Sequence, residues 1–219
     1  MAPEPRRPRP RWLFWLAQAL AAAIILACVA GSLGGFTLDV YEYQCYALAF
    51  WRGAGGLAAL PAGQCDLMRD IVGHPLAAAP FHTIPVEYGA LTLVALLPPL
   101  LAPAAWYPWL FGGEMALAIG ATAWLCARMG GARAGYVYLT WLLAGVATLA
   151  GTRFDALPAL FTVLALACAR RRWTVRAALL LAAATLIKWY PLVLLAPLLV
   201  MEARVVGLRL RLLRVPVAF

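Results

Sequence analysis

An uninterrupted apolar run near the N-terminus decides what kind of molecule this chain can form. Residues 12–33 contain no charged side chain and are long enough to cross a hydrocarbon core of about 30 Å. Further apolar runs follow, and the chain is 65% hydrophobic and only 12% charged, against about 25% charged in soluble domains. In lipid such runs must be helical, because no other local structure satisfies their backbone groups. The sequence therefore predicts an all-α, polytopic transmembrane helix bundle.

The basic residues orient these helices. Of the 18 basic residues all but one are arginine, and they lie in short clusters between apolar runs. This arrangement is typical of the positive-inside bias and not of a nucleic-acid surface, so no nucleic-acid partner is expected. Residues 1–11 combine four prolines with four arginines and predict a disordered cytoplasmic tail. A signal peptide is the alternative interpretation, but the run 12–33 is longer than a usual signal and has interfacial tryptophans.

Charge also decides which segments cross. Residues 86–103 are apolar but interrupted by prolines, and if they crossed, the later arginines would lie outside. If they form a re-entrant or surface segment instead, 14 of the 18 basic residues are cytoplasmic. We therefore predict a multi-pass domain over 12–219 in the plasma membrane, with a cytoplasmic N-terminus, an outer loop over 36–88 and about six spans. The five spans predicted after the first are 106–129, 134–151, 156–169, 175–187 and 190–200.

The outer loop is predicted to contain one helix. Residues 40–51 carry aromatic side chains at helical spacing from Asp39 onward, which suits a helix lying on the membrane surface. Residues 53–85 are rich in glycine and proline and predict loop with short turns. Cys45 and Cys65 share this outward-facing loop, so a disulfide between them is allowed, but no spacing signature requires it.

Ionisable residues from three parts of the chain meet at the outer face of this topology. They are Asp39 and Glu42 after the first span, Arg153 and Asp155 at a predicted turn, and Lys188, the single lysine. Ionisable residues at membrane depth are costly and usually functional. Arg153 and Lys188 have the chemistry to hold a phosphate, and a carboxylate opposite them could take a proton from an attacking hydroxyl. This combination predicts group transfer from a lipid phosphate.

Each of these residues also has a purely structural interpretation. Asp39 could cap a helix, and Asp155 could cap the next helix or pair with Arg153. Lys188 could extend to the membrane interface as lysines at span ends do, and Glu42 could lie on a solvated face. His74, His82 and the nearby acids Asp66 and Asp70 lack the convergent spacing of a metal site, and Glu114, in a predicted span, is a weaker site candidate.

The order of the short motifs is similar to that of a known family. The motifs are Asp39-x-Tyr41 after the first span, Glu87-Tyr88 before an apolar run, Arg153-Phe154-Asp155, and Lys188-Trp189-Tyr190-Pro191. Over residues 12–201 this order resembles the GT-C superfamily of polytopic glycosyltransferases. Within that superfamily it resembles the glycosyltransferase 87 group, related to polyprenyl-phosphate-mannose-dependent mannosyltransferases.

The resemblance implies a GT-C-like N-terminal module that transfers a hexose, often mannose, with inversion. The donor would be a polyprenyl-phosphate sugar, and the lipid or glycan acceptor would lie at the extracytoplasmic membrane face. Asp39 matches the family's general base, and Lys188 matches the lysine that neutralises the departing phosphate. The further candidate substrate-binding residues are Tyr41, Glu42, Glu87, Tyr88, Arg153, Asp155 and Tyr190. Some relatives bind a divalent cation between outer-loop acids, a role open to Asp39 with Asp155, but no cofactor or metal is predicted.

The chain departs from the family pattern in two respects. The family commonly has Pro-Pro after the Glu-Tyr pair, whereas Gly89 and Ala90 follow it here. The chain also ends at Phe219 within a new apolar segment, so an inactive truncated relative is one alternative. A lipid or solute transporter is another, although the acids cluster at one face and no internal repeat is present.

Overall fold

The computed structural model describes residues 11–33, 38–73, 75–84 and 88–206. All regular secondary structure in these ranges is helical, which confirms the predicted all-α class. The longest helices are α1 (Arg11–Leu33), α5 (Tyr107–Gly130) and α6 (Ala132–Ala150), and the later helices are α7 (Ala156–Arg170), α8 (Thr174–Ile187), η4 (Tyr190–Leu194) and α9 (Leu195–Val206). Between α1 and α5 lie α2 (Leu38–Arg52), η1 (Ala54–Ala59), α3 (Asp66–Val72), α4 (Thr92–Ala95), η2 (Pro98–Leu101) and η3 (Ala104–Trp106).

Two described helices are long and apolar enough to cross a membrane. They cover Trp12–Gly31 and Ala104–Gly130. Three shorter apolar helices cover Ala156–Arg170, Thr174–Ile187 and Tyr190–Val200. The apolar runs in the sequence thus form helices close to their predicted boundaries.

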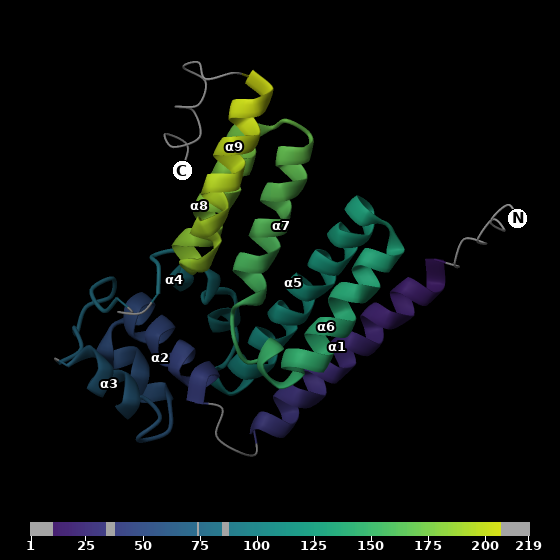
Figure 1. The fold of residues 1–219 in the computed structure, drawn as a ribbon. Coiled ribbons are helices and arrows are strands. Elements are labelled where there is room, and N and C mark those ends of the chain that lie inside the picture. Colours follow the sequence, from purple (N-terminus) through teal and green to yellow (C-terminus); the bar gives the residue numbers. More distant parts are fainter. Residues whose placement is uncertain (1–10, 34–37, 74, 85–87, 207–219) are drawn as a thin grey trace, which may run out of the picture.

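The helices α1, α5 and α6 pack against one another (Figure 1). On α1 the buried residues are Ala21, Ile25 and Val29, which recur every four residues on one face. Gly151 follows α6 and faces this stripe, where an added Cβ would lie only 2.7 Å from Val29 Cγ2 and 2.8 Å from Ile25 Cγ2. Small residues of this kind let helices approach closely where apolar burial alone gives no preference.

The helices α7, α8 and α9 form a second group, which joins the first where α7 packs on α5. The α7–α8 contact is built from small residues, since Ala165, Ala169, Ala177 and Ala178 are all buried there. At the end of α7, Arg170 Nη1 donates to the carbonyl oxygen of Met129 at 2.8 Å. The α5–α6 and α7–α8 turns therefore lie at the same end of the bundle.

The opposite end of the bundle carries α2 and the short helices around it (Figure 1). The described part of the segment predicted as re-entrant or surface, residues 88–103, contains α4 and η2, and η3 follows it; all three lie at this end, beside α2 or the adjoining end of α5. The Trp51 indole N–H donates to Leu93 O at 2.9 Å, and Gln44 Nε2 donates to Ala104 O at 2.9 Å. We call α2, α3 and these short helices the cap.

The structure corrects two predictions about the cap. The predicted helix over 40–51 exists as α2, but residues 43–49 are all buried inside the protein. Tyr43 among them packs on Phe111 of α5 and on Phe154, so α2 is a core helix and not a surface helix. The region predicted as loop with short turns contains the helix α3. A disulfide joins Cys45 of α2 to Cys65, the residue before α3, with the Cα atoms 5.7 Å apart. The cap is therefore a covalently closed unit packed around α2.

Candidate functional site

Two ion pairs lie side by side at the cap end of the bundle. Arg153 Nε donates to Asp39 Oδ2 at 2.7 Å, and Lys188 Nζ donates to Asp155 Oδ1 at 2.6 Å. All four side chains remain partly exposed, between 30% and 46%. The structure thus brings together four charged residues that the sequence analysis took from three separate segments, and it pairs each cation with one carboxylate.

The elements that carry these residues explain their position. Asp39 lies in the first turn of α2, where a negative charge complements the helix dipole. Arg153 and Asp155 flank Phe154 on the turn between α6 and α7, and Lys188 directly follows α8. The predicted Arg153–Asp155 pair is wrong, because the Asp155 carboxylate pairs with Lys188. Asp155 does occupy the N-cap position of α7, as the other structural interpretation expected, but its side chain makes no capping hydrogen bond.

A cluster of aromatic rings holds these segments together. The buried ring of Phe154 lies 5.0 Å from the Tyr43 ring centroid and 4.9 Å from that of Tyr88, both edge to face. The ammonium of Lys188 lies 5.2 Å from the centroid of the Phe154 ring. The cluster therefore connects α2, the segment before α4 and the α6–α7 turn. Neither Tyr43 nor Phe154 was predicted as a site residue, although Tyr43 follows Asp39 by one helical turn and Phe154 lies inside the Arg-x-Asp motif.

The segment after Tyr88 is fixed to the end of α8. Leu91 N donates to Leu186 O at 3.1 Å, and the Thr92 hydroxyl donates to Ile187 O at 2.7 Å. An added Cβ at Gly89 would overlap the Leu186 carbonyl group. Position 89 therefore requires glycine, because only glycine permits so close a backbone approach. This attachment sets the backbone from which Lys188 extends.

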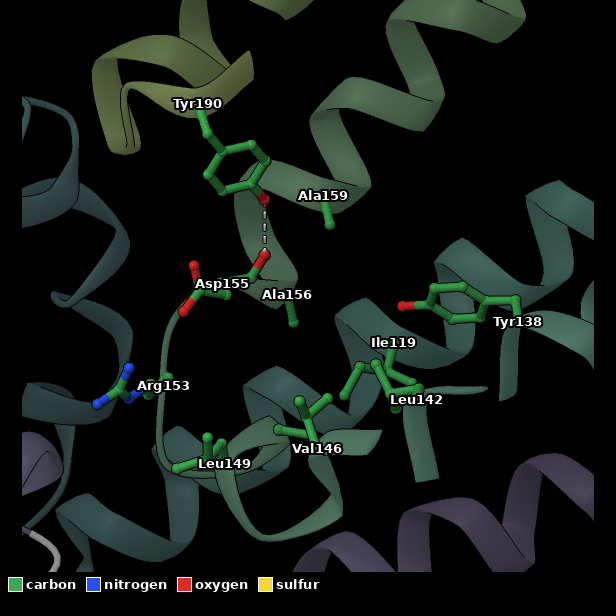
Figure 2. A pocket seen from close by; sticks show the side chains of 11 residues that line it. Ile119, Tyr138, Leu142, Val146, Leu149, Arg153, Asp155, Ala156, Ala159 and Tyr190 are labelled. Atoms are coloured by element: carbon green, nitrogen blue, oxygen red, sulfur yellow. Dashed lines mark hydrogen bonds between the residues drawn. The ribbon is translucent and has the colours of Figure 1, made fainter. Parts of the chain in front are cut away.

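A cavity of about 380 Å³ opens beside the ion pairs, between α5, α6 and α7 (Figure 2). Its volume is within the range of small-molecule sites. Arg153, Asp155 and Tyr190 line one side of it, and the Tyr138 hydroxyl points into it from α6. The rest of the lining is apolar, namely Ile119, Leu142, Val146, Leu149, Ala150, Ala156 and Ala159. The cavity thus has a polar mouth and an apolar interior, which we call the channel. It was not predicted from the sequence.

The shape of the cavity follows from α6. Tyr138, Leu142, Val146 and Leu149 recur on one side of that helix and span roughly 16 Å at 1.5 Å per residue. The backbone of Val146 is not helical, with φ −144° and ψ 25°, so α6 bends where it lines the cavity. On α7 the facing residues are the small side chains Ala156 and Ala159, which leave the space open.

The remaining predicted site residues are placed differently. Tyr190 donates a hydrogen bond of 3.3 Å to the carbonyl oxygen of Asp155 and lines the cavity. Tyr88 belongs to the aromatic cluster. Glu42 follows Asp39 by three residues on α2, whereas Tyr41 follows it by two and points to another side of the helix. Glu87 lies outside the described residues, as do most of the predicted tail and His74.

Charge interactions reinforce the arrangement of the mouth. The hydrogen bond from Arg153 to Asp39 and the charge of that carboxylate raise the pKa of the Arg153 guanidinium. Burial raises the pKa of the Tyr43 phenol above its ordinary value, with a further contribution from the neighbouring Tyr88. Tyr43 therefore stays neutral and serves as a packing residue beside two charged pairs.

The acids do not assemble into a metal site among the described residues. No group of three or more histidine, cysteine, aspartate or glutamate side chains lies close enough to hold an ion in the part of the chain that the structure describes. Asp39 and Asp155 are each paired with a cationic side chain. Glu114 lies on α5 outside the cavity lining, with Oε2 buried and without a hydrogen-bond partner.

The chain has no match among protein-family models, curated proteins or solved structures. Its function is therefore inferred from the cap-end charges, the cavity and the helical architecture.

Proposed function

We propose that this chain is a polytopic membrane glycosyltransferase with a GT-C-like module, which transfers a hexose from a lipid-phosphate donor to an acceptor hydroxyl. The observation that carries the proposal is the convergence of two cations and two carboxylates beside an apolar cavity, whose mouth is lined by one of each, Arg153 and Asp155. A lipid monophosphate sugar needs both parts of such a site, since its chain requires apolar surface and its phosphate requires cations.

We assign the cap end to the extracytoplasmic side. The turns that carry Arg128, Arg133 and the cluster Arg170 to Arg172 lie together at the other end, which favours that end as cytoplasmic. The Cys45–Cys65 disulfide supports the same orientation, because disulfides persist outside the reducing cytoplasm. These two features are independent, since one concerns charge and the other redox chemistry.

The donor fits with its chain in the apolar cavity and its phosphate at the mouth. The channel lined by Leu142, Val146 and Ala159 offers the lipid chain apolar contact, and each methylene that enters it from water is worth about 0.8 kcal/mol. Arg153 lines the mouth directly. Lys188 does not line it, but its ammonium donates to Asp155, which does. The phosphate would replace the carboxylates as the partner of one or both cations.

The reaction then needs one proton acceptor and one stabilised leaving group. The acceptor oxygen attacks the anomeric carbon, and its proton passes to the Asp39 carboxylate. The bond between the anomeric carbon and the phosphate oxygen breaks, and its electron pair stays on the phosphate. Arg153 and Lys188 neutralise the resulting negative charge. Attack from the face opposite the phosphate gives inversion, and mannose is the sugar that we expect from the family resemblance.

The direct test supplies radiolabelled polyprenyl-phosphate mannose to proteoliposomes that contain the chain, together with a lipid extract as acceptor. Transfer yields a labelled product that resists mild acid, whereas the donor is cleaved by it. Movement of labelled donor lipid across the bilayer without sugar transfer would instead identify a lipid transporter. Protein that binds the donor and gives neither result would be an inactive relative.

Replacing Lys188 by alanine should weaken donor binding by about 10- to 100-fold. This corresponds to the loss of a hydrogen bond to a charged group, about 1.5–3 kcal/mol. Donor and acceptor affinities are measured separately by titration in detergent. Arg69→Ala is the matched control, since Arg69 also forms an ion pair at the cap end, with Asp66 at 3.2 Å, but lies on α3. An equal loss of donor and acceptor affinity in Lys188→Ala would indicate a folding defect and would count against the assigned role.

A larger side chain in the cavity should weaken binding of the lipid chain and leave binding of the phosphate unchanged. In Ala159→Phe the phenyl ring occupies the channel, and we expect at least about tenfold weaker binding of farnesyl phosphate, the equivalent of about two buried methylenes. Affinity for inorganic phosphate should not change. Ala144→Phe is the control, because Ala144 is exposed on α6 and is not part of the lining. Unchanged farnesyl phosphate binding in Ala159→Phe would place the lipid chain elsewhere.

A further inference from the structure

The proposed base is not free in this structure. Asp39 Oδ2 accepts the Nε–H of Arg153 at 2.7 Å, which holds the carboxylate toward the α6–α7 turn. The two residues are 114 positions apart in the sequence and belong to different elements. The same turn carries Asp155, whose carboxylate accepts a hydrogen bond from the Lys188 ammonium and forms an ion pair with it. Without substrate, each proposed catalytic carboxylate and each proposed phosphate ligand therefore has a partner of opposite charge.

These ion pairs are weak enough to exchange. The side chains of Arg153 and Asp39 are 46% and 33% exposed, and ion pairs with that access to water contribute little to stability. A phosphate offers the guanidinium two parallel hydrogen bonds, whereas Asp39 receives only one from Nε in this structure. A lipid phosphate whose chain is already bound in the cavity adds a high local concentration to this advantage.

We propose that Arg153 is a positioning residue that restrains Asp39 until the phosphate of the donor takes its guanidinium. This inference rests on the proposed function, and it adds a fixed order of binding. The donor binds first, and its phosphate takes Arg153 away from Asp39. The acceptor hydroxyl then binds beside a carboxylate that is no longer ion-paired. Arg153 thus has two partners in turn, the base in the resting protein and the phosphate in the donor complex.

The proposed order explains why the base and the phosphate ligands form one connected set. Arg153 and Asp155 both line the cavity mouth, while their partners Asp39 and Lys188 lie outside the lining. A phosphate that enters through the mouth therefore meets the guanidinium before it reaches the base. When the lipid phosphate product leaves and Asp39 has lost its proton to water, the Arg153–Asp39 pair can form again.

The test measures the accessibility of Asp39 directly, with no need for turnover. The full chain in detergent is treated with a water-soluble carbodiimide and glycinamide, and the labelling rate of each carboxylate is followed by peptide mass spectrometry. Farnesyl phosphate is the probe, and farnesol is the control for the lipid chain alone. We expect farnesyl phosphate to accelerate labelling of Asp39 by up to about fivefold, the upper end for release from an exposed ion pair.

Two comparisons separate this effect from a general loosening of the protein. Asp66 pairs with Arg69 on α3, so its labelling should not respond to farnesyl phosphate. In Arg153→Gln, Asp39 should be labelled rapidly with or without the probe, and Arg153→Lys should restore part of the response. A wild-type chain that binds farnesyl phosphate in a titration but shows unchanged or slower labelling of Asp39 would overturn the inference and leave the proposed function standing. Failure to bind farnesyl phosphate would overturn both.

Discussion

Asp39→Asn should reduce glycosyl transfer by about 10²- to 10⁴-fold while the protein stays folded, because it removes the proposed general base. Asparagine has the shape of aspartate and is equally compatible with the start of a helix, so the first turn of α2 should be retained. The Arg153 partner is 46% exposed and can be solvated, so loss of the ion pair should cost at most about 1 kcal/mol. The measurement is the initial rate of label transfer from polyprenyl-phosphate mannose at saturating donor.

Asp39→Asn should lower the rate of transfer without lowering the affinity for the donor. Donor affinity should hold or improve in Asp39→Asn, because Arg153 no longer has a competing carboxylate. Asp66→Asn is the control for a carboxylate that is also ion-paired at the cap end and lies on α3, and it should keep full activity. If Asp39→Asn retains wild-type transfer, the base is another residue, and Asp155, the other carboxylate at the mouth, becomes the next candidate.

The bundle could be predicted from the sequence because its signal is local. A run such as residues 12–33 must be helical in lipid whatever its neighbours are, and α1 covers it. The arginine clusters at the α5–α6 and α7–α8 turns are likewise a local signal, because each is read directly from the residues between two apolar runs. The proline-broken segment from 86 to 103 was assigned by charge balance, and in the structure its described part forms two short helices of the cap. The number of membrane crossings stays a prediction.

The pairing within the site could not be predicted, because it depends on long-range geometry. The predicted topology placed Asp39, Arg153 and Lys188 at one end of the bundle, and their residue types gave the chemistry expected of them. Which carboxylate meets which cation depends on how the Phe154 ring packs against Tyr43 and Tyr88, since this fixes the turn from which Arg153 and Asp155 extend. Proximity in sequence suggested an Arg153–Asp155 pair, and tertiary packing gave each of them a different partner.

The cap shows the same limit for secondary structure. The spacing of aromatic residues correctly predicted a helix at α2, but the same pattern suits a membrane surface and a buried core equally well. The choice depends on what covers the helix, and here the covering segments come from residues as distant as Leu93 and Ala104. The helix α3 was missed because a helix of seven residues gives little periodic signal. The cavity was missed because it requires the bend at Val146 and the separation of α6 from α7.

Removing the Cys45–Cys65 disulfide should lower the stability of the protein by about 3 kcal/mol, the value for closure of a loop of about 20 residues; the two cysteines are 20 positions apart. The loss should fall mainly on the cap, since the bond joins α2 to the start of α3. For a chain of this length the melting temperature should fall by about 6–12 °C. The variant is Cys45→Ala with Cys65→Ala, because both sites are buried and serine would add an unpaired hydroxyl.

A thiol reductant separates the covalent bond from the effect of changing two core side chains. It should lower the melting temperature of the wild-type protein and leave that of the double variant unchanged, and Cys168→Ala, at a free cysteine of α7, should respond to it like the wild type. The activity assay should follow the same pattern, because α2 carries Asp39 and Tyr43 into the site. Cys45 and Cys65 found as free thiols in protein taken from cells would remove one of the two arguments for an extracytoplasmic cap, and the orientation would then depend on the arginine turns alone.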